Sequence, residues 1–433
     1  MRGSAASLWR HSDFLKFWGG ETISLFGSQI TLLALPLTAV LLLDATPGQM
    51  GILNASQTAP FLLLSLFAGI WVDRKARRPI LAISNLARTA LLASVPLLFV
   101  SNMLRIEYLY VIAFLIGGCM LLFELAYQSY LPRLVDRSDL VEANGKLTAT
   151  ASITEIAGPG LAGLLVEWLT APLALFIDAA TFLIAGINLL LIRRPEPAIV
   201  PEPGRSLRND IAAGFRCLFG NHYIRAVAGE AATNNFFWHG IQAVFVVYAV
   251  RELGLTAGDL GIILSISSVG GLVGVFLTVR AARRFRTGPT IIGAVIIKDS
   301  ATLLLPFIVR STSGPTWMPA ALLALTFFIQ GMGVTGCNVH TYSLRQALIP
   351  DHLLGRTNAA YRLLSWGPIP LGSLLGGFLG TQIGLRPTLL VCAIGLLFTW
   401  LWLYYSPIRT MPQIPAADDA FVTREQEPAP AAA

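Results

Sequence analysis

Long apolar stretches dominate this chain of 433 residues and limit what it can fold into. An α-helix rises about 1.5 Å per residue, so roughly 20 apolar residues cross the hydrocarbon core of a bilayer. Only 13% of the residues are charged, against about one quarter in soluble domains. We therefore predict an all-α membrane protein with twelve transmembrane helices. The expected spans are 17–43, 51–72, 79–100, 108–131, 144–166, 173–192, 226–250, 260–279, 289–309, 318–344, 357–382 and 386–405.

The basic residues are distributed unequally between the two sides of the membrane that these spans define. Lys and Arg collect in the cytoplasmic loops of membrane proteins. Most of the 31 Lys and Arg lie on the side of the N-terminus, and the opposite loops hold only Arg105, Arg251, Arg310 and Arg386. We expect a multi-pass protein of the inner (plasma) membrane with cytoplasmic N- and C-termini. The net charge of +7 reflects this asymmetry and does not indicate a nucleic-acid partner.

The two halves of the chain resemble each other. A shift of 210 residues places Arg88 on Lys298, and a shift of 214 places Gly158 on Gly372. Such a repeat indicates two pseudo-symmetric six-helix halves, over residues 1–192 and 226–406. Residues 193–225 are expected to form a cytoplasmic linker with an amphipathic helix. Residues 407–433, rich in Ala and Pro, are expected to be a disordered cytoplasmic tail.

A charged motif follows the second span. The stretch GIWVDRKARR contains Gly69, Asp73, Arg74, Arg77 and Arg78, and it resembles the pattern G-x-x-x-D-R-x-x-R-R between spans 2 and 3 of the major facilitator superfamily. Residues 126–147 and 344–360 resemble the loops 4–5 and 10–11 of its macrolide-efflux and enterobactin-exporter-like branch, a branch of drug:proton antiporters. The resemblance covers nearly the whole chain. It implies the major facilitator fold, in which two six-helix halves repeat in parallel.

The resemblance implies that this motif is a cytoplasmic latch. Gly69 would permit close helix contact. Asp73 would lie near a helix N-terminus or a basic partner, where a negative charge is favoured, and Arg133 is the candidate partner. The arginines of the motif would hold the chain to anionic lipid. The second half has Thr278 or Val279 where the acid is expected, so its latch should be weaker.

The stretch GPGLAG, residues 158–163, fits the pattern G-x-G-x-x-G of a dinucleotide-binding loop. Such a loop requires a preceding strand and a helix that begins at the phosphates, whereas apolar helical sequence flanks this stretch on both sides. We instead predict a packing and hinge element. Pro159 would kink its helix, and Gly158 and Gly163 would let a neighbouring helix come close. Gly372 and Gly376 are expected to do the same in the second half.

Ionisable residues inside spans are costly and are candidate functional groups. In the family fold, spans 1, 4, 7 and 10 line the central cavity, so the resemblance favours Glu124, Glu21 and Glu230 as proton-coupling or substrate-binding acids. Glu124 is the strongest candidate because it lies deepest in its span. The alternative for Glu124 is a structural hydrogen bond or ion pair. Glu21 and Glu230 could instead reach the interface or pair with Lys16 or Arg225.

The remaining charged residues of the spans are expected to be structural. They are Asp178, Glu155, Arg88, Arg362, Lys298 and Asp299. Polar and aromatic residues of the same central spans are the predicted lining of the cavity. They are Gln29, Tyr127, Gln128, Asn234, Asn235, Trp238, His239, Gln242, Gln330 and Asn338.

No enzyme motif is present, and the four cysteines lack the spacing of a metal site or a disulfide framework. We expect no enzyme activity, no cofactor and no metal. The leading hypothesis is a monomeric secondary transporter that exports a small organic compound (a drug, macrolide or natural product) by alternating access, in exchange for protons. One alternative is a siderophore or lipid exporter, or a facilitator, without proton coupling. Another is a membrane sensor or assembly partner that transports nothing.

Overall fold

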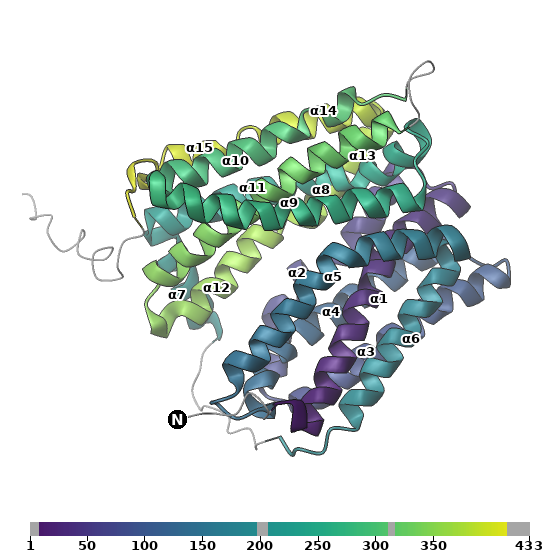
Figure 1. The fold of residues 1–433 in the computed structure, drawn as a ribbon, viewed down its shortest axis with the longest axis horizontal. Coiled ribbons are helices and arrows are strands. Elements are labelled where there is room, and N and C mark those ends of the chain that lie inside the picture. Colours follow the sequence, from purple (N-terminus) through teal and green to yellow (C-terminus); the bar gives the residue numbers. More distant parts are fainter. Residues whose placement is uncertain (1–7, 197–206, 311–316, 414–433) are drawn as a thin grey trace, which may run out of the picture.

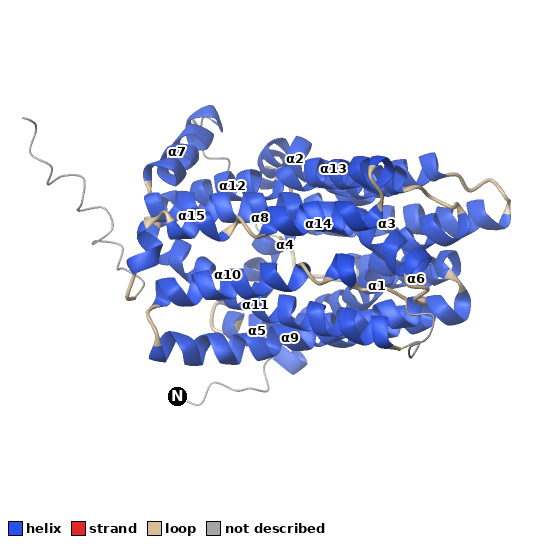
Figure 2. Ribbon diagram, turned by 90° about the horizontal axis from the view of Figure 1, so that it is seen from above, coloured by secondary structure: helices blue, strands red, loops and turns tan. Residues whose placement is uncertain are grey.

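The computed structural model describes residues 8–196, 207–310 and 317–413, and within these ranges it consists of helices and connecting loops. The helices are α1 (Ser12–Leu42), α2 (Pro47–Asp73), α3 (Arg77–Val100), α4 (Ile106–Leu134), α5 (Leu140–Leu169), α6 (Ala171–Leu190), α7 (Leu207–Gly220), α8 (His222–Val247), α9 (Ala257–Arg284), α10 (Thr287–Thr302), α11 (Met318–Leu348), α12 (Asp351–Trp366), α13 (Pro368–Gln382), α14 (Leu385–Leu396) and α15 (Trp400–Tyr404). Figure 2 shows most of the long helices running along the same direction.

The predicted spans are confirmed as helices. Among the described residues, ten helical segments are long and apolar enough to cross a membrane. α2 and α8 account for the two other predicted spans, and α8 falls short in hydropathy because it carries many polar residues. The span predicted over 357–382 is divided into α12 and α13. Pro368 has no backbone N–H to donate, and it begins the second of these helices instead of continuing the first.

The helices form two bundles (Figure 1). In the first bundle, α1–α6, α1 packs against α5 and α6, and α4 packs against α2 and α3. In the second, α8–α15, α11 packs against α9 and α10, while α8 packs against α13 and α14. α7 lies beside α12. Across the bundles, α5 packs on α9 and α2 packs on α13.

The two bundles share one hydrophobic core at only one end. We call this end, with the loops 43–46 and 253–256, the distal end; the other, with residues 135–139 and α7, is the linker end. At the distal end a single cluster of buried side chains includes Leu33 and Val40 of α1 together with Val244 and Leu260 of the second bundle. At the linker end the buried side chains form two separate clusters, one in each bundle. The bundles are therefore joined distally and separate toward the linker.

Glycines make the distal contact close. A Cβ atom on Gly51 of α2 would lie 2.8 Å from the Cα of Gly377 in α13. A Cβ on Gly261 of α9 would lie 2.4 Å from the backbone oxygen of Pro159 and 3.0 Å from the Cα of Gly163 in α5. Backbones can approach this closely only where side chains are absent.

Polar contacts flank these glycines at the distal end. Arg251 of the second bundle pairs with Asp44 of the first at 2.6 Å. The Glu167 carboxylate of α5 accepts hydrogen bonds from the backbone N–H of Gly258 at 2.9 Å and from the Thr256 hydroxyl at 3.1 Å. The same end of α9 is closed by a capping box, in which Thr256 and Asp259 satisfy each other's backbone N–H groups.

The tail was predicted to be disordered from residue 407, but its first residues are ordered. Pro407–Thr410 form a 3₁₀ turn, and the Ile408 side chain is buried. The backbone N–H of Gly288 donates to Met411 O at 3.0 Å, and that of Thr287 donates to Pro412 O at 3.1 Å. These bonds satisfy N–H groups that the start of α10 leaves without helical partners. The rest of the predicted tail, 414–433, lies outside the described residues.

The close approach of α5 and α9 gives a test of the distal contact. Gly261→Leu places a side chain where backbone now lies, and overpacking of this kind costs about 1–3 kcal/mol. Thiol cross-linking between cysteines introduced at positions 44 and 251, in a background without the native cysteines, should therefore fall several-fold. Gly118→Leu is the control, because Gly118 has open space around it. An unchanged yield for Gly261→Leu, or an equal fall in the control, would contradict the contact.

Candidate functional site: the cavity between the bundles

A cavity of about 730 Å³ lies between the two bundles, with walls from α1, α5, α8, α9 and α11. We call it the central cavity. Predicted lining residues that do line it are Gln29, Asn234, Asn235, Trp238, His239, Gln242, Gln330 and Asn338. Glu155 is its only carboxylate among the described lining residues, and no Lys or Arg lines it. The structure thus brings most of the predicted set together around one space.

α8 supplies much of the polar wall. Asn234, Trp238 and Gln242 are spaced four residues apart, so they follow one another along a single face of the helix. The Asn234 amide donates to Asp299 Oδ1 at 3.2 Å, and the Asn235 amide donates to the backbone oxygen of Ser365 at 2.7 Å. These bonds hold both amides at the cavity wall.

Two of the predicted lining residues lie elsewhere. The Tyr127 ring stacks between Phe17 and Phe123, with ring centres 5.7 Å and 5.9 Å apart. Gln128, the next residue, is exposed and is not among the residues that line the cavity. The prediction placed both on the cavity side of α4, but the aromatic cluster inside the first bundle takes the Tyr127 ring instead.

One wall of the central cavity is rich in serine, which the sequence did not predict. Ser267 and Ser268 of α9 and Ser152 of α5 line the central cavity. Serines in a span are a weak signal, because the hydroxyl can bond to its own helix, as Ser268 does to Leu264 O at 3.3 Å. Only the position of α9 against α5 shows that these hydroxyls face the cavity.

A second cavity of about 790 Å³ adjoins the first and shares Asn234, Asn235 and Asn338 with it. Arg345 lies in its wall toward the linker end, with its guanidinium 3.8 Å from the centre of the Tyr361 ring. At this distance the ring attracts the cation. Arg345 was not predicted as a site residue, since in the sequence it belongs to the loop-like segment 344–360.

Glu124 forms an ion pair between the bundles. Its Oε1 lies 2.9 Å from Nη2 of Arg362 in α12, and both side chains are about 30% exposed, at 32% and 28%. The Arg362 guanidinium also lies 4.6 Å from the centre of the Trp366 ring. Glu124 was predicted as a cavity acid with an ion pair as its alternative, and in this conformation it is paired. Arg362 was expected to pair within the bundle, but its partner is in the opposite one.

Glu230 is paired within its own bundle. Its Oε1 lies 3.3 Å from Nζ of Lys298, which also contacts Asp299 Oδ1 at 2.8 Å. All three side chains are less than 7% exposed. The alternative prediction, a pair between Glu230 and Arg225, is therefore wrong, because α10 places Lys298 beside Glu230. Buried charges at this depth require a partner, and Lys298 satisfies two carboxylates at once.

Glu21 belongs to a matching cluster in the first bundle. Arg88 lies within electrostatic reach of both Glu21 and Asp178, although no ion pair between them is found among the described residues. The Arg88 guanidinium lies between the rings of Phe123 and Phe182, about 5 Å from each centre. Among the described residues, its Nε and one Nη have no hydrogen-bond acceptor. Lys16, the predicted alternative partner of Glu21, pairs instead with Asp13 at 2.9 Å.

Asp178 completes that first cluster from α6. It accepts hydrogen bonds from the hydroxyls of Thr31 and Thr181, the latter at 2.9 Å. Each bundle therefore places two carboxylates near one buried cation, Arg88 or Lys298. The repeat had aligned these two cations, and this alignment is the signal from which the paired clusters could have been found. The cluster of the second bundle is closed by ion pairs, whereas that of the first leaves its cation without one.

At the linker end, Glu196 makes the kind of contact that was predicted for Asp73 of the latch. It lies at a helix N-terminus and beside Arg133. Its carboxylate accepts hydrogen bonds from the backbone N–H of Arg77, at 2.8 and 2.9 Å, and of Arg78, at 3.2 Å. Arg133 donates to it at 3.3 Å. Glu196 thus caps α3, which has no side-chain cap of its own at Ala76.

Other parts of the predicted latch are less closely packed. The side chain of Asp73 lies outside the described residues. A Cβ on Gly69 would meet nothing within 4 Å, so this glycine makes no close helix contact here, contrary to expectation. Arg74 is exposed. Nearby, Arg194 donates to Asp136 at 2.9 Å, and this hydrogen bond lowers the pKa of that carboxyl below its ordinary value.

The predicted packing glycines lie at helix contacts. A Cβ on Gly158 would lie 2.5 Å from the Gln29 side chain in α1. In α13, Cβ atoms on Gly372 and Gly376 would lie 1.9 and 2.2 Å from backbone oxygens of α8. Pro159 lies inside α5, which continues through it to Leu169. No nucleotide-type strand-loop-helix is formed in this helical segment.

The sequence matches the model of the Major Facilitator Superfamily over residues 17–367 and again over 231–432. The chain belongs to this superfamily. It is a multi-pass membrane transporter with the all-helical major facilitator fold, and not an enzyme. The resemblance noted in the loop 2–3 motif is thereby confirmed.

Similar curated proteins include multidrug efflux pumps. The chain is 25% identical to the multidrug efflux pump Tap of Mycolicibacterium fortuitum over 383 residues, covering 86% of this chain and 90% of the relative. It is 25% identical to Tap of Mycobacterium tuberculosis (strain H37Rv) over 407 residues, covering 90% and 93%. Multidrug resistance protein 1 of Bacillus subtilis is 24% identical, over 83% of this chain and 92% of its own.

Solved structures share the fold. A bacterial homologue of the iron transporter ferroportin, in an inward-facing state, superposes with a TM-score of 0.71 at 15% identity, over 92% of this chain and 98% of the other. A bacterial homologue of the human lysosomal transporter Spinster has a TM-score of 0.68 at 14% identity, over 99% and 100%. At these sequence identities the likeness shows the shared fold and says nothing about the substrate of this chain.

The cap on α3 predicts a stabilising role for Glu196. Glu196→Ala removes the acceptor of two backbone N–H groups and of Arg133, and loss of such a cap costs about 1 kcal/mol. Equilibrium unfolding of the detergent-purified protein should show a decrease of that size. Glu142→Ala is the control, because its pair with Lys146 at 3.5 Å is a helical i,i+4 contact worth below about 0.5 kcal/mol. Equal stability of both variants would contradict the cap.

Proposed function

We propose that this transporter exports a small organic compound by alternating access, in exchange for protons. The central cavity carries the proposal: it lies between two bundles that share a core at the distal end and have separate cores at the linker end. Rocking of one bundle against the other would close the linker end and open the distal end around the same site. The likeness to drug efflux pumps supports export.

The cavity wall favours a neutral or cationic ligand with an aromatic or apolar part. Trp238 and Phe327 present rings to the cavity, with ring centres 6.1 Å apart. Amides and hydroxyls supply hydrogen bonds, and Glu155 supplies the negative charge. A cavity with this mixture, and no Lys or Arg in its described wall, fits drug-like compounds better than organic anions.

Proton exchange would act through the Glu124–Arg362 pair. The pair links the two bundles and both side chains are partly exposed, so solvent protons can reach Glu124. Protonation would neutralise the carboxylate and release Arg362, and this would change the free energy of moving one bundle against the other. Glu21 and Glu230 would contribute from within single bundles, where they adjust the buried charge and do not cross between halves.

The topology that goes with this proposal has both termini and the linker on the cytoplasmic side of the plasma membrane. The basic residues of the linker end support it, because cytoplasmic loops of membrane proteins are enriched in Lys and Arg. The two six-helix halves, 1–192 and 226–406, would move as the two units of one monomer. The contacts within each bundle support this division.

Glu124→Gln tests proton exchange. The amide can still bond to Arg362, but it cannot exchange a proton, so substrate efflux driven by an imposed pH gradient in proteoliposomes should fall to the passive rate. Equilibrium ligand binding should remain, because Glu124 is not in the cavity wall. Ethidium and a macrolide serve as probe compounds.

The control for this variant is Glu107→Gln, an exposed carboxylate in the first turn of the same helix, which should transport as the wild type does. Full gradient-driven efflux by Glu124→Gln would rule out coupling through this residue. Absence of efflux by the wild type for every compound tested would instead refute the export proposal itself.

A further inference from the structure

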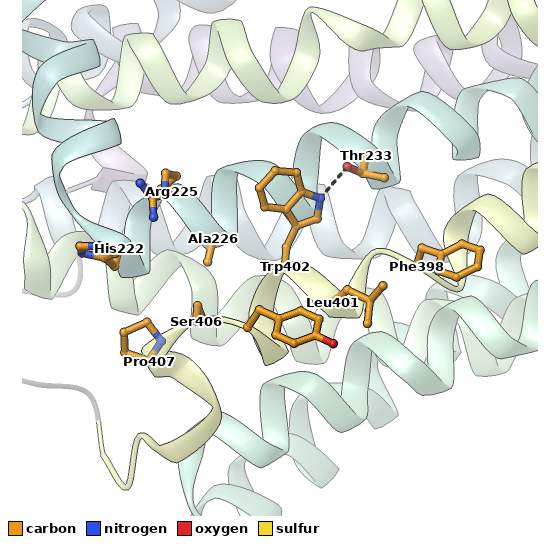
Figure 3. Close-up of a pocket in the computed structure, with 10 residues that line it drawn as sticks. His222, Arg225, Ala226, Thr233, Phe398, Leu401, Trp402, Ser406 and Pro407 are labelled. Carbon is orange, nitrogen blue, oxygen red and sulfur yellow. Dashed lines mark hydrogen bonds between the residues drawn. The ribbon is translucent and has the colours of Figure 1, made fainter.

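A groove of about 520 Å³ opens on the outside of the second bundle, between α8 and the α14–α15 segment. It shares no lining residue with the central cavity. Figure 3 shows its labelled residues, with His222 and Arg225 at one end, Phe398 at the other and Trp402 between them. The groove is therefore separate from the site described above.

The groove changes from basic to apolar along its length. Its basic end lies at the start of α8, where His222 and Arg225 are both exposed. Thr233 lies about three turns further along α8, roughly 16 Å deeper in the span. The apolar end is formed by Phe398, which is 58% exposed, and by Leu401. This order matches an amphiphile with its headgroup at the membrane surface and its chains in the hydrocarbon.

The charge of the basic end meets no acidic group of the described chain. The described lining of the groove contains no Asp or Glu. The Arg225 side chain has no ion-pair or hydrogen-bond partner in the part of the chain that the structure describes. An exposed arginine at the end of a span attracts the anionic headgroups of a bilayer.

The floor of the groove is built to hold its shape. The Trp402 ring lies on Gly229, where a Cβ would be 2.6 Å from ring carbons. The indole N–H donates to the Thr233 hydroxyl at 3.0 Å, drawn as a dashed line in Figure 3. Tyr405, 82% exposed, stands at the rim. A Tyr at the rim is typical of the membrane interface, where one side of the ring is apolar and the other polar.

We propose that this groove binds one anionic phospholipid, with its phosphate on Arg225 and His222 and an acyl chain along Trp402, Leu401 and Phe398. The charge at one end and the apolar wall at the other select this occupant. A zwitterionic lipid would lack the net charge, and a free phosphate would leave the aromatic wall uncovered. The site is independent of the proposed export activity, because none of its residues lies in the central cavity.

Native mass spectrometry of the full-length protein tests this site. Phosphatidylglycerol or phosphatidylcholine is added to the detergent-purified wild type, and we expect one phosphatidylglycerol to be retained preferentially. In the variant with both Arg225→Gln and His222→Gln this preference should be lost, with retention at least about fivefold weaker, the factor expected for one basic residue near a membrane surface. Arg286→Gln, an exposed arginine outside the groove at the same end, should retain the lipid as the wild type does.

Several outcomes would overturn the proposal. One is equal retention of both lipids by the wild type, and another is unchanged phosphatidylglycerol retention by the double variant. Displacement of the lipid by millimolar inorganic phosphate would assign the site to free phosphate. If removal of residues 414–433 strengthens lipid binding, the natural occupant of the groove is the chain's own acidic tail and not a lipid. Because both substituted side chains are exposed, the variants should unfold at the wild-type temperature without lipid, and this measurement verifies the comparison.

Discussion

The close backbone contact of glycines at the distal end is the constraint on which the arrangement of the two bundles depends. Gly51 against Gly377 and Gly163 against Gly261 bring helices of opposite bundles together without side chains between them. In a bilayer, lipid is as apolar as the helix surface, so association relies on such close packing and on polar contacts. The Asp44–Arg251 pair adds one of these contacts. Where the glycines end, the two cores separate, and the cavity lies between them.

The buried charges obey a second constraint, which acts within each bundle. A charge inside a span requires a partner or a bridging group, and each bundle supplies two carboxylates and one cation. The second bundle closes this set through Lys298, while Arg88 in the first is held between two aromatic rings. Glu124 and Arg362 differ from both sets, because their pair crosses between the bundles. Its position is what makes it sensitive to their relative motion.

Prediction from the sequence succeeded where a local pattern carries the information. Apolar length gave the spans, and the spacing of Asn234, Trp238 and Gln242 gave one face of α8. It failed where the partner is distant in the chain. Glu196, more than 100 residues after α3 begins, caps that helix, and nothing in the Pro-rich linker sequence distinguishes it from the neighbouring acids. Tyr127 was assigned to the cavity, although aromatic neighbours from α1 and its own helix hold it elsewhere.

The sequence by itself determined the number of spans, their approximate ends, the repeat and the superfamily, because each follows from hydropathy, proline positions or a contiguous motif. The tertiary structure alone decided which acids are paired, which serines face the cavity and where an anionic lipid would bind. Those properties depend on which side chains of distant helices meet, and on how far apart the two bundles stand. The distance of 2.9 Å between the charged atoms of Glu124 and Arg362 is set by the packing of whole bundles, and no pattern along the chain encodes it locally.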